Sequence, residues 1–299
     1  MAKVFALWNC VRRCELRQDY RFGVSEFTTW NSSFEDDVTI YSQCGVDTIE
    51  ITEFKLDRNG FRQQLQNLSG MQVSSVQATV HSLFPDGLAG EPPDPKDRAR
   101  HIRTTIEKFS PHLPAGTPFV AITGAAPGGN SQHVYDVAVR EFAELARVAQ
   151  AAGMRLAFEP LNPILFNSDT ALWTLSDALE LVRAVDHPAF GLCLDAWNIW
   201  QTPELSKVIA QAGDRIFLVQ VSDWRRPRSH NDRISVGDGS IPLAHIVAAS
   251  RNAGYNGPYV LEIFSSESLA DSIWLQSPVD VVRKNKDAFS QVWEQSLRA

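Results

Sequence analysis

Short apolar segments and longer amphipathic segments alternate along most of the chain. Eight short segments are rich in β-forming residues and end at turn residues or at a polar group, which predicts strands. They cover residues 22–29, 46–51, 73–82, 118–124, 155–160, 190–195, 216–223 and 259–264. Segments with apolar residues at helical spacing lie between them, at residues 33–45, 133–153, 176–188 and 242–254. Strands that alternate with helices in this way predict an α/β fold, the (β/α)8 TIM barrel.

Turn and capping residues mark the ends of the predicted helices. Ser33 and Ser176 stand where N-cap residues are preferred. Glycines follow the last apolar positions of three helices, at Gly45, Gly153 and Gly254. These signals divide the chain into the alternating units that a barrel requires.

An open doubly wound sheet is the alternative fold, and it needs a glycine-rich phosphate loop after an early strand. The segment "GAAPGGN" at 124–130 lacks the G-x-G-x-x-G spacing, which favours the barrel. No linker or break in composition divides the chain. We therefore expect one TIM-barrel domain over residues 1–299, with residues 1–21 as a peripheral extension.

The charge and cysteine content exclude several classes of partner. The chain has 28 basic and 35 acidic residues, whereas nucleic-acid binding favours a basic face. It has no run of about 18 apolar residues, so we expect no membrane span, and the first residues lack a signal-peptide pattern. Four cysteines do not make a disulfide framework, which predicts a cytoplasmic protein. Cys10 and Cys14 have no second Cys or His pair nearby, which disfavours a metal site there.

Each of the last four predicted strands places one polar residue in the parity that faces the barrel interior. Alternate side chains of a strand point to opposite faces, and the apolar parity of these strands faces the helices. The inward polar residues near the carboxyl ends are Glu159, Asp195, Gln220 and Glu262. Active sites of such barrels lie at this end, so we expect the four side chains to converge.

A divalent cation would offset the mutual repulsion of three carboxylates in a buried pocket. Three carboxylate oxygens and one amide oxygen suit Mn²⁺ best, with Mg²⁺ or Co²⁺ as alternatives and Zn²⁺ disfavoured. Buried salt bridges with lysine or arginine are the alternative interpretation. The predicted strands contain few basic residues, which favours the metal.

The motifs around these residues resemble those of the xylose isomerase-like TIM-barrel family of sugar phosphate isomerases and epimerases. The matching segments are "FEPLN" (158–162), "LDAWN" (194–198), "VQVSDWRR" with "GDG" (219–239) and "LEIF" (261–264). The resemblance implies that Glu159, Asp195, Gln220 and Glu262 are the metal ligands. Two positions depart from the pattern: Asn198 replaces a substrate-contacting histidine, and Leu165 replaces a glutamate of ketose 3-epimerases.

The chemistry that this site predicts is proton abstraction next to a carbonyl, with the metal as a Lewis acid and an enediolate as intermediate. Glu159 or Glu262 takes the proton, and the other glutamate returns it. Return to the other face epimerises and return to the neighbouring carbon isomerises. Loss of a β-leaving group instead makes the enzyme a dehydratase or lyase, for example on dehydroshikimate, a keto-inositol or a 3-keto-glycoside.

Further residues are candidates for binding the small-molecule substrate. They are His81, Trp197, Asn198, Trp224 and Arg226. A core histidine is the alternative for His81, and packing under a loop is the alternative for the tryptophans. Arg226 stands where relatives place a substrate-binding arginine, with Arg225, Arg228 and Arg233 as competitors. Glu50 is expected to form a hydrogen bond behind the ligands.

Other function classes fit the sequence less well. An apurinic endonuclease of this fold needs several zinc ions and many histidines, and this acidic chain has seven His. A binding barrel without activity would hold the metal and turn over nothing. The resemblance implies a homo-oligomer, and a small partner subunit if the protein is a lyase.

Overall fold

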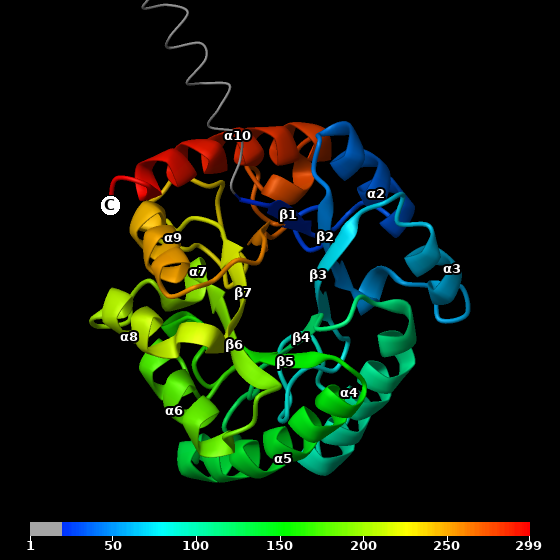
Figure 1. Cartoon of the computed structure of the whole chain (residues 1–299), viewed down its shortest axis with the longest axis vertical. Coiled ribbons are helices and arrows are strands. Elements are labelled where there is room, and N and C mark those ends of the chain that lie inside the picture. The colour runs from blue at the N-terminus through cyan, green and yellow to red at the C-terminus, as the bar shows by residue number, and fades with distance from the viewer. Residues whose placement is uncertain (1–19) are drawn as a thin grey trace, which may run out of the picture.

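Eight parallel strands form a closed barrel in the computed structural model, which describes residues 20–299. Strand β1 pairs with both β2 and β8, so the sheet has no open edge (Figure 1). The strands are β1 Phe22–Ser25, β2 Thr48–Thr52, β3 Gln72–Gln77, β4 Pro118–Ala121, β5 Arg155–Phe158, β6 Phe190–Asp195, β7 Ile216–Val221 and β8 Tyr259–Leu261. Each overlaps one of the predicted strands, and the (β/α)8 prediction is confirmed. Cys10, Cys14 and most of the predicted extension lie outside the described residues.

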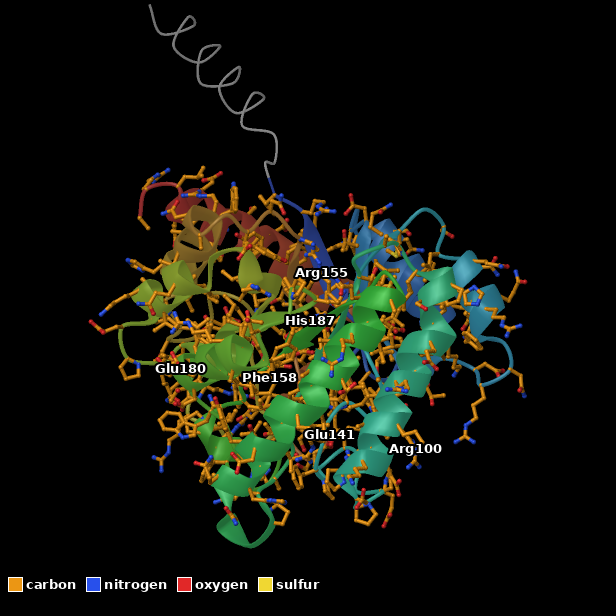
Figure 2. All side chains as sticks on the ribbon, turned by 60° about the horizontal axis from the view of Figure 1, so that its bottom comes forward. Arg100, Glu141, Arg155, Phe158, Glu180 and His187 are labelled. Atoms are coloured by element: carbon orange, nitrogen blue, oxygen red, sulfur yellow. The ribbon has the colours of Figure 1, made fainter. Side chains whose placement is uncertain are left out.

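The helices surround the strands as an outer ring (Figure 1). They are α2 Phe34–Gln43, α3 Phe61–Gln66, α4 Pro95–Phe109, α5 Ser131–Ala151, α6 Leu175–Val185, α7 Ala196–Ile199, α8 Leu205–Ala212, α9 Leu243–Asn252 and α10 Pro278–Ser296. Figure 2 looks onto the outer surface of α4 and α5, where Arg100 and Glu141 lie. In the described part of the chain, no helix combines the length and the apolar character needed to cross a membrane.

The ends of the helices follow the predicted signals with one exception. Ser33 caps α2, and its Oγ accepts a hydrogen bond of 3.1 Å from the Asp36 N–H. The prediction of Ser176 as a cap is wrong, because Ser176 already lies inside α6. Thr174 caps that helix instead, and its hydroxyl accepts 3.0 Å from the Asp177 N–H.

Strand β3 ends earlier than the sequence predicted. The expected segment ran to residue 82, but the regular strand stops at Gln77. Ser82 forms an isolated parallel bridge with Ile122, so the chain continues alongside β4 after an irregular stretch. His81 therefore lies on the loop after β3, and Gln77 is the last inward side chain of the strand itself.

The barrel interior and the helix-facing layer are two separate apolar clusters. The interior cluster contains Val120, Ala157, Cys193, Leu218 and Val260. The large outer cluster contains the alternate residues of the same strands, including Leu156, Leu192, Leu194, Val219 and Leu261. The predicted parity of β5 to β8 is thus correct. The next inward position beyond the interior cluster is polar on each of these strands, and this layer forms the candidate site.

Candidate metal centre

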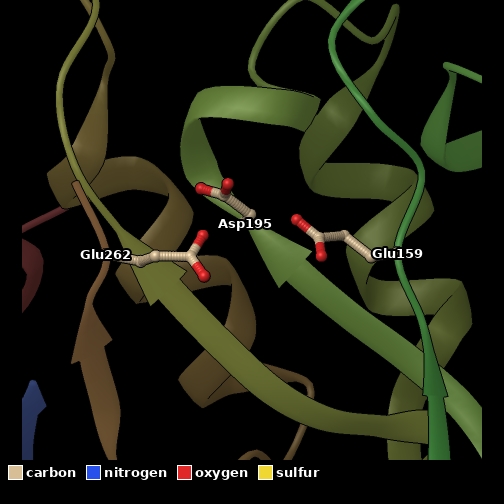
Figure 3. A group of neighbouring side chains, drawn as sticks. All are labelled: Glu159, Asp195 and Glu262. Atoms are coloured by element: carbon tan, nitrogen blue, oxygen red, sulfur yellow. The ribbon is translucent and has the colours of Figure 1, made fainter. Parts of the chain in front are cut away.

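Glu159, Asp195 and Glu262 bring their carboxylates together at the carboxyl end of the barrel. One oxygen from each lies within 4.8 Å of the others, and all three residues are buried. Figure 3 shows the three side chains pointing toward one another from separate strands. Glu159 and Glu262 directly follow β5 and β8, and Asp195 is the last residue of β6. We call these three residues the acidic triad; their role as ligands and bases stays a prediction.

Asn198 and the start of helix α7 hold two members of the triad. Asn198 Nδ2 donates to Glu159 Oε1 at 2.7 Å and to Asp195 Oδ2 at 2.9 Å. The Trp197 N–H donates to Asp195 Oδ1 at 3.0 Å. Asn198 Oδ1 accepts in turn from the Asn162 N–H at 2.8 Å. The residue predicted to touch substrate is therefore already engaged with the acids.

A layer of amides and one further carboxylate lies behind the triad. Gln220 Nε2 donates to Glu262 Oε1 at 2.9 Å and to Glu50 Oε1 at 2.9 Å. The expected hydrogen bond of Glu50 behind the ligands is thus present. Gln77 Nε2 donates to Glu262 Oε1 at 3.1 Å. Sequence reasoning missed Gln77, although it stands in the inward parity of its strand.

The amide of Gln220 presents its nitrogen, not its oxygen, to the carboxylates. Gln220 Oε1 lies 2.9 Å from the Cys193 sulfur, which donates to it. An amide ligates a cation through its oxygen, so a ligating role requires this group to be turned over. In the arrangement seen, Gln220 is a hydrogen-bond donor that links Glu50 to Glu262.

Arg233 is the cationic partner that the strand sequences did not reveal. Its Nη1 donates to Asp195 Oδ2 at 2.6 Å and to Glu262 Oε2 at 2.9 Å. Its guanidinium carbon lies 4.9 Å from the Trp197 ring centroid and 5.0 Å from that of Phe264. Arg233 belongs to the loop after β7, which is why strand composition gave no sign of it. Two of the three acids, Asp195 and Glu262, therefore form the buried salt bridges of the alternative interpretation.

Burial raises the pKa of the acids, and one guanidinium does not balance them. Burial, and then the charge of Asp195, raises the pKa of Glu159 to about 8. Burial raises the pKa of Glu262 well above its usual value, and also raises those of Asp195 and Glu50. Four neighbouring carboxylates face a single arginine, so the site lacks positive charge. A set of oxygen donors with an excess of negative charge fits a hard divalent cation.

A pocket opens above the triad. The space between its walls is about 560 Å³, including the open mouth. Glu159, Glu262, Gln77 and Arg233 line the pocket together with His81. Its apolar walls are Phe27, Leu88, Ile122, Leu161, Leu165 and Phe264. Glu159 and Glu262 are therefore accessible to a small molecule with an apolar face, while Asp195 lies buried beside them.

The predicted substrate-binding residues fall into three groups. His81 lines the pocket, with its Nδ1 3.1 Å from the Ala78 carbonyl oxygen. Trp197 is fully buried beneath Arg233, and the half-buried Trp224 packs against Trp200 at 5.2 Å between centroids. Arg226 is exposed and is not among the residues that line the pocket. Substrate contact stays a prediction for each of these residues.

Aspartate side chains fix the loop that carries Arg233. Asp223 accepts from the N–H groups of Trp224, Gly237, Gly239 and Ile241 at 2.8–3.1 Å. A Cβ at Gly239 would lie 2.4 Å from the Trp224 carbonyl oxygen, so only glycine fits this turn. Asp232 pairs with Arg225 at 2.8 Å and Arg228 at 3.0 Å. Arg225 and Arg228, two of the alternatives to Arg226 as the substrate-binding arginine, thus form ion pairs within this loop.

Comparison with known proteins identifies relatives over most of the barrel. The family model described as "Xylose isomerase-like TIM barrel" matches residues 38–289. A probable ketose 3-epimerase of Synechocystis sp. PCC 6803 is 26% identical over 259 residues, which cover 83% of this chain and 85% of the epimerase.

A 3-dehydroshikimate dehydratase of Pseudomonas putida KT2440 is 33% identical over 133 residues. The match covers 40% of this chain and 19% of that dehydratase, so the alignment spans about a fifth of its length. A solved structure of the IOLI protein with a bound zinc atom superposes with a TM-score of 0.77 at 19% identity, covering 92% of this chain and 99% of that one. At this level of identity, the superposition supports the fold alone.

Proposed function

The chain belongs to the xylose isomerase-like TIM barrel family, and from this premise we propose that it is a divalent-metal-dependent isomerase or epimerase. Its substrate is a hydroxycarbonyl carbohydrate or a related compound, and the reaction is proton abstraction alpha to the carbonyl through an enediolate. The observation that carries the proposal is the acidic triad, of which Glu159 and Glu262 line an open pocket and Asp195 lies buried beside them.

The triad would hold the cation, with Gln220 as a fourth ligand once its amide is turned over. Mn²⁺ is the cation we propose, with Mg²⁺ and Co²⁺ as alternatives. When bound, such a cation supplies Lewis-acid polarisation of a carbonyl oxygen. Zn²⁺ belongs in the test, because the solved IOLI protein carries that metal.

Glu159 is the better placed of the two glutamates to take the first proton. Its Oε2 has no hydrogen-bond partner among residues 20–299, and this oxygen is not sealed from solvent. Both oxygens of Glu262 accept hydrogen bonds, from Gln77 and Gln220 on one side and from Arg233 on the other. A free carboxylate oxygen with a raised pKa is suited to proton transfer near neutral pH. Glu262 then returns the proton.

A dehydratase or lyase acting on a cyclic keto compound is the second candidate. The 33% identical dehydratase segment and the aromatic pocket walls favour it. Dehydroshikimate, a keto-inositol and a 3-keto-glycoside are the substrate types to test. Proton removal by Glu159 would then be followed by loss of a β-leaving group, such as hydroxide or an aglycone.

Solvent exchange in D₂O tests the proposal directly. The protein is incubated with Mn²⁺, Mg²⁺, Co²⁺ or Zn²⁺ and a panel of ketoses, dehydroshikimate, keto-inositols and 3-keto-glycosides. We expect deuterium at the α-carbon, and a product without water or aglycone identifies a lyase. Glu262→Gln should slow the exchange at least about 100-fold. Full exchange by this variant would remove Glu262 from the mechanism, and absence of exchange with every compound and metal would overturn the proposed function.

The assembly state is a further proposal. We expect a homo-oligomer, and a small partner subunit if the protein is a lyase. Light scattering of the purified chain measures the first.

A further inference from the structure

Arg233 is attached to the site through only one of its nitrogens. Nη1 makes the contacts to Asp195 and Glu262 and a third, of 3.3 Å, to the Glu262 carbonyl oxygen. Within residues 20–299, Nε and Nη2 have no hydrogen-bond partner, and neither atom is sealed from solvent. These two nitrogens form one edge of the planar guanidinium, and this edge matches the two oxygens of a carboxylate.

The backbone and the neighbouring rings keep this edge in place. The Arg233 N–H donates to the Phe264 carbonyl oxygen at 3.1 Å, and the next residue, Ile234, pairs with Asp223. The guanidinium also lies over the rings of Trp197 and Phe264. A side chain held by ion pairs, by its own backbone and by ring contacts loses little further freedom when it binds a ligand. The edge is therefore preorganised.

The other charged residues around the pocket do not offer a similar position. Asp86 accepts from the backbone N–H groups of Leu88 and Ala89, and Asp169 accepts from that of Gly87. Arg233 is the single lysine or arginine among the described residues that line the pocket. Among the described residues that line the pocket, this guanidinium is therefore the position where an anionic group of a ligand would meet a lysine or arginine charge.

We propose that the substrate carries a carboxylate, and that the Nε–Nη2 edge of Arg233 binds it beside the acidic triad. This inference rests on the proposed function, because it assumes that the hydroxycarbonyl group of the same molecule lies at the triad. The substrate class is then a hydroxyketo acid, linear or cyclic, whose carbon skeleton packs on the apolar walls. Arg233, and not the exposed Arg226, is the arginine that selects it.

Matched pairs of ligands test this inference in the wild-type protein. Calorimetry with the Mn²⁺-loaded protein compares D-fructuronate with D-fructose, and 3-dehydroshikimate with its methyl ester. Within each pair, a carboxylate is replaced by a neutral group. We expect the acid of at least one pair to bind about 10-fold to 100-fold more tightly than its neutral partner. Equal binding within both pairs, or failure of both acids to bind, would overturn the inference.

Substitutions then assign the selectivity to one arginine. Arg233→Lys keeps the charge but removes the paired N–H groups, so it should lower the preference for the acid over its neutral partner by about tenfold. Arg226→Gln should keep the preference, and its loss in that variant alone would overturn the assignment to Arg233. Arg100→Gln, on the outer face of α4 (Figure 2), is the unaffected control.

Two outcomes separate this inference from the proposed function. If neutral ketoses and acids exchange α-deuterium equally well, and Arg233→Lys affects both alike, the function stands and the inference fails. If the acids bind through Arg233 but no compound exchanges deuterium, the carboxylate site stands and the proposed reaction fails. Circular dichroism checks that Arg233→Lys folds; if it does not, the wild-type comparison of each acid with its neutral partner still decides.

Discussion

Two buried acidic clusters lie in this barrel, and they differ in how their charge is balanced. The first is the acidic triad with Glu50 and Arg233, of which Glu159, Glu262 and Arg233 line the pocket. The second, which we call the Lys55 cluster, consists of Glu26, Asp37, Lys55, Thr29 and Tyr41 near the ends of β1 and β2. None of these five residues lines the pocket. Burial raises carboxyl pKa values in both clusters, so a raised pKa alone does not mark a functional site.

The Lys55 cluster supplies most of its own hydrogen-bond partners. Within residues 20–299, one of its carboxylate oxygens, Glu26 Oε1, is buried without a partner. Lys55 Nζ lies 2.6 Å from Asp37 Oδ2 and donates to the Thr29 carbonyl oxygen at 2.8 Å. Thr29 donates to Asp37 Oδ1 at 2.6 Å, and the Thr52 N–H donates to Glu26 Oε2 at 2.8 Å. Burial raises the pKa of Asp37 only to about 6, because Lys55 offsets part of the cost. One proton on Glu26 leaves this cluster neutral without any added ion.

The acidic triad and Glu50 together have one guanidinium for four carboxylates, and two of the four, Glu159 and Glu262, line an open pocket. Excess negative charge together with access to a pocket is therefore what distinguishes a candidate ion site from a structural one. The following predictions test this difference, beginning with the largest effect.

Removing the ammonium from the Lys55 cluster should cost the most stability. Lys55→Met leaves Asp37 and Glu26 buried without a cation, which should lower the free energy of unfolding by about 3–5 kcal/mol. Urea denaturation measures this change, and Mn²⁺ affinity should stay unchanged. Lys207→Met, which breaks an exposed pair with Glu204, is the control and should leave stability unaffected. Wild-type stability in Lys55→Met would show that the cluster does not need its cation.

Neutralising one carboxylate in each cluster should affect Mn²⁺ affinity very differently. Asp195→Asn removes a charge from the proposed cation site and should weaken Mn²⁺ binding at least about 100-fold. Asp37→Asn should change the affinity by less than about threefold, since Asp37 is paired with Lys55. Calorimetry and the electron paramagnetic resonance of free Mn²⁺ give the affinities. Equal losses in both variants would contradict the distinction.

The pH dependence of metal binding should follow Glu159. Its raised pKa means that the metal-free folded chain holds a proton that the unfolded chain releases at lower pH. The metal-free protein should therefore lose stability as the pH rises from about 4.5 toward 8. Mn²⁺ needs the ionised form, so its affinity should increase up to about tenfold per pH unit over the same range.

Melting temperatures with and without Mn²⁺ check this prediction, and the gain on adding Mn²⁺ should grow with pH. Glu159→Gln should make that gain smaller and less dependent on pH. A gain independent of pH in the wild type would remove Glu159 from the ligand set.

Two hydroxyl groups provide the smallest and most closely matched comparison. Ser75 donates to Glu50 behind the triad, and Thr29 donates to Asp37 in the Lys55 cluster. Ser75→Ala and Thr29→Val should each lower the free energy of unfolding by about 1–2 kcal/mol. Ser75→Ala should also weaken Mn²⁺ binding by about tenfold, because Glu50 contacts the proposed ligand Glu262 through Gln220. An equal effect of Thr29→Val on Mn²⁺ would refute the separation of the clusters.

Residues on the strands were predictable because their placement follows from local geometry. Apolar and polar positions alternate in β5 to β8, and a strand must point alternate side chains to opposite faces. The parity of Glu159, Asp195 and Glu262 was therefore readable from the chain. The closed barrel then brings these three side chains together at the carboxyl ends of the strands.

Residues on loops were not predictable in this way. Ser176 is a good cap by type, yet Thr174 has the extended backbone that capping needs. His81 was expected on a strand, but β3 stops at Gln77. Arg226 fits a family spacing, whereas Arg233 reaches the acids because its loop is pinned by Asp223 and Asp232. Loop paths depend on contacts between residues far apart in the chain, and spacing along the sequence does not record them.

The amino-acid sequence by itself determined the alternation of strands and helices and the set of acids that faces the barrel interior. Both follow from the covalent geometry of the strand and the period of the apolar positions. Only the tertiary structure decided which basic side chain pairs with two of those acids and which way the Gln220 amide points. The backbone N–H of Arg233 donates to the Phe264 carbonyl oxygen in the loop after β8, so its guanidinium reaches the acids only after the barrel has closed.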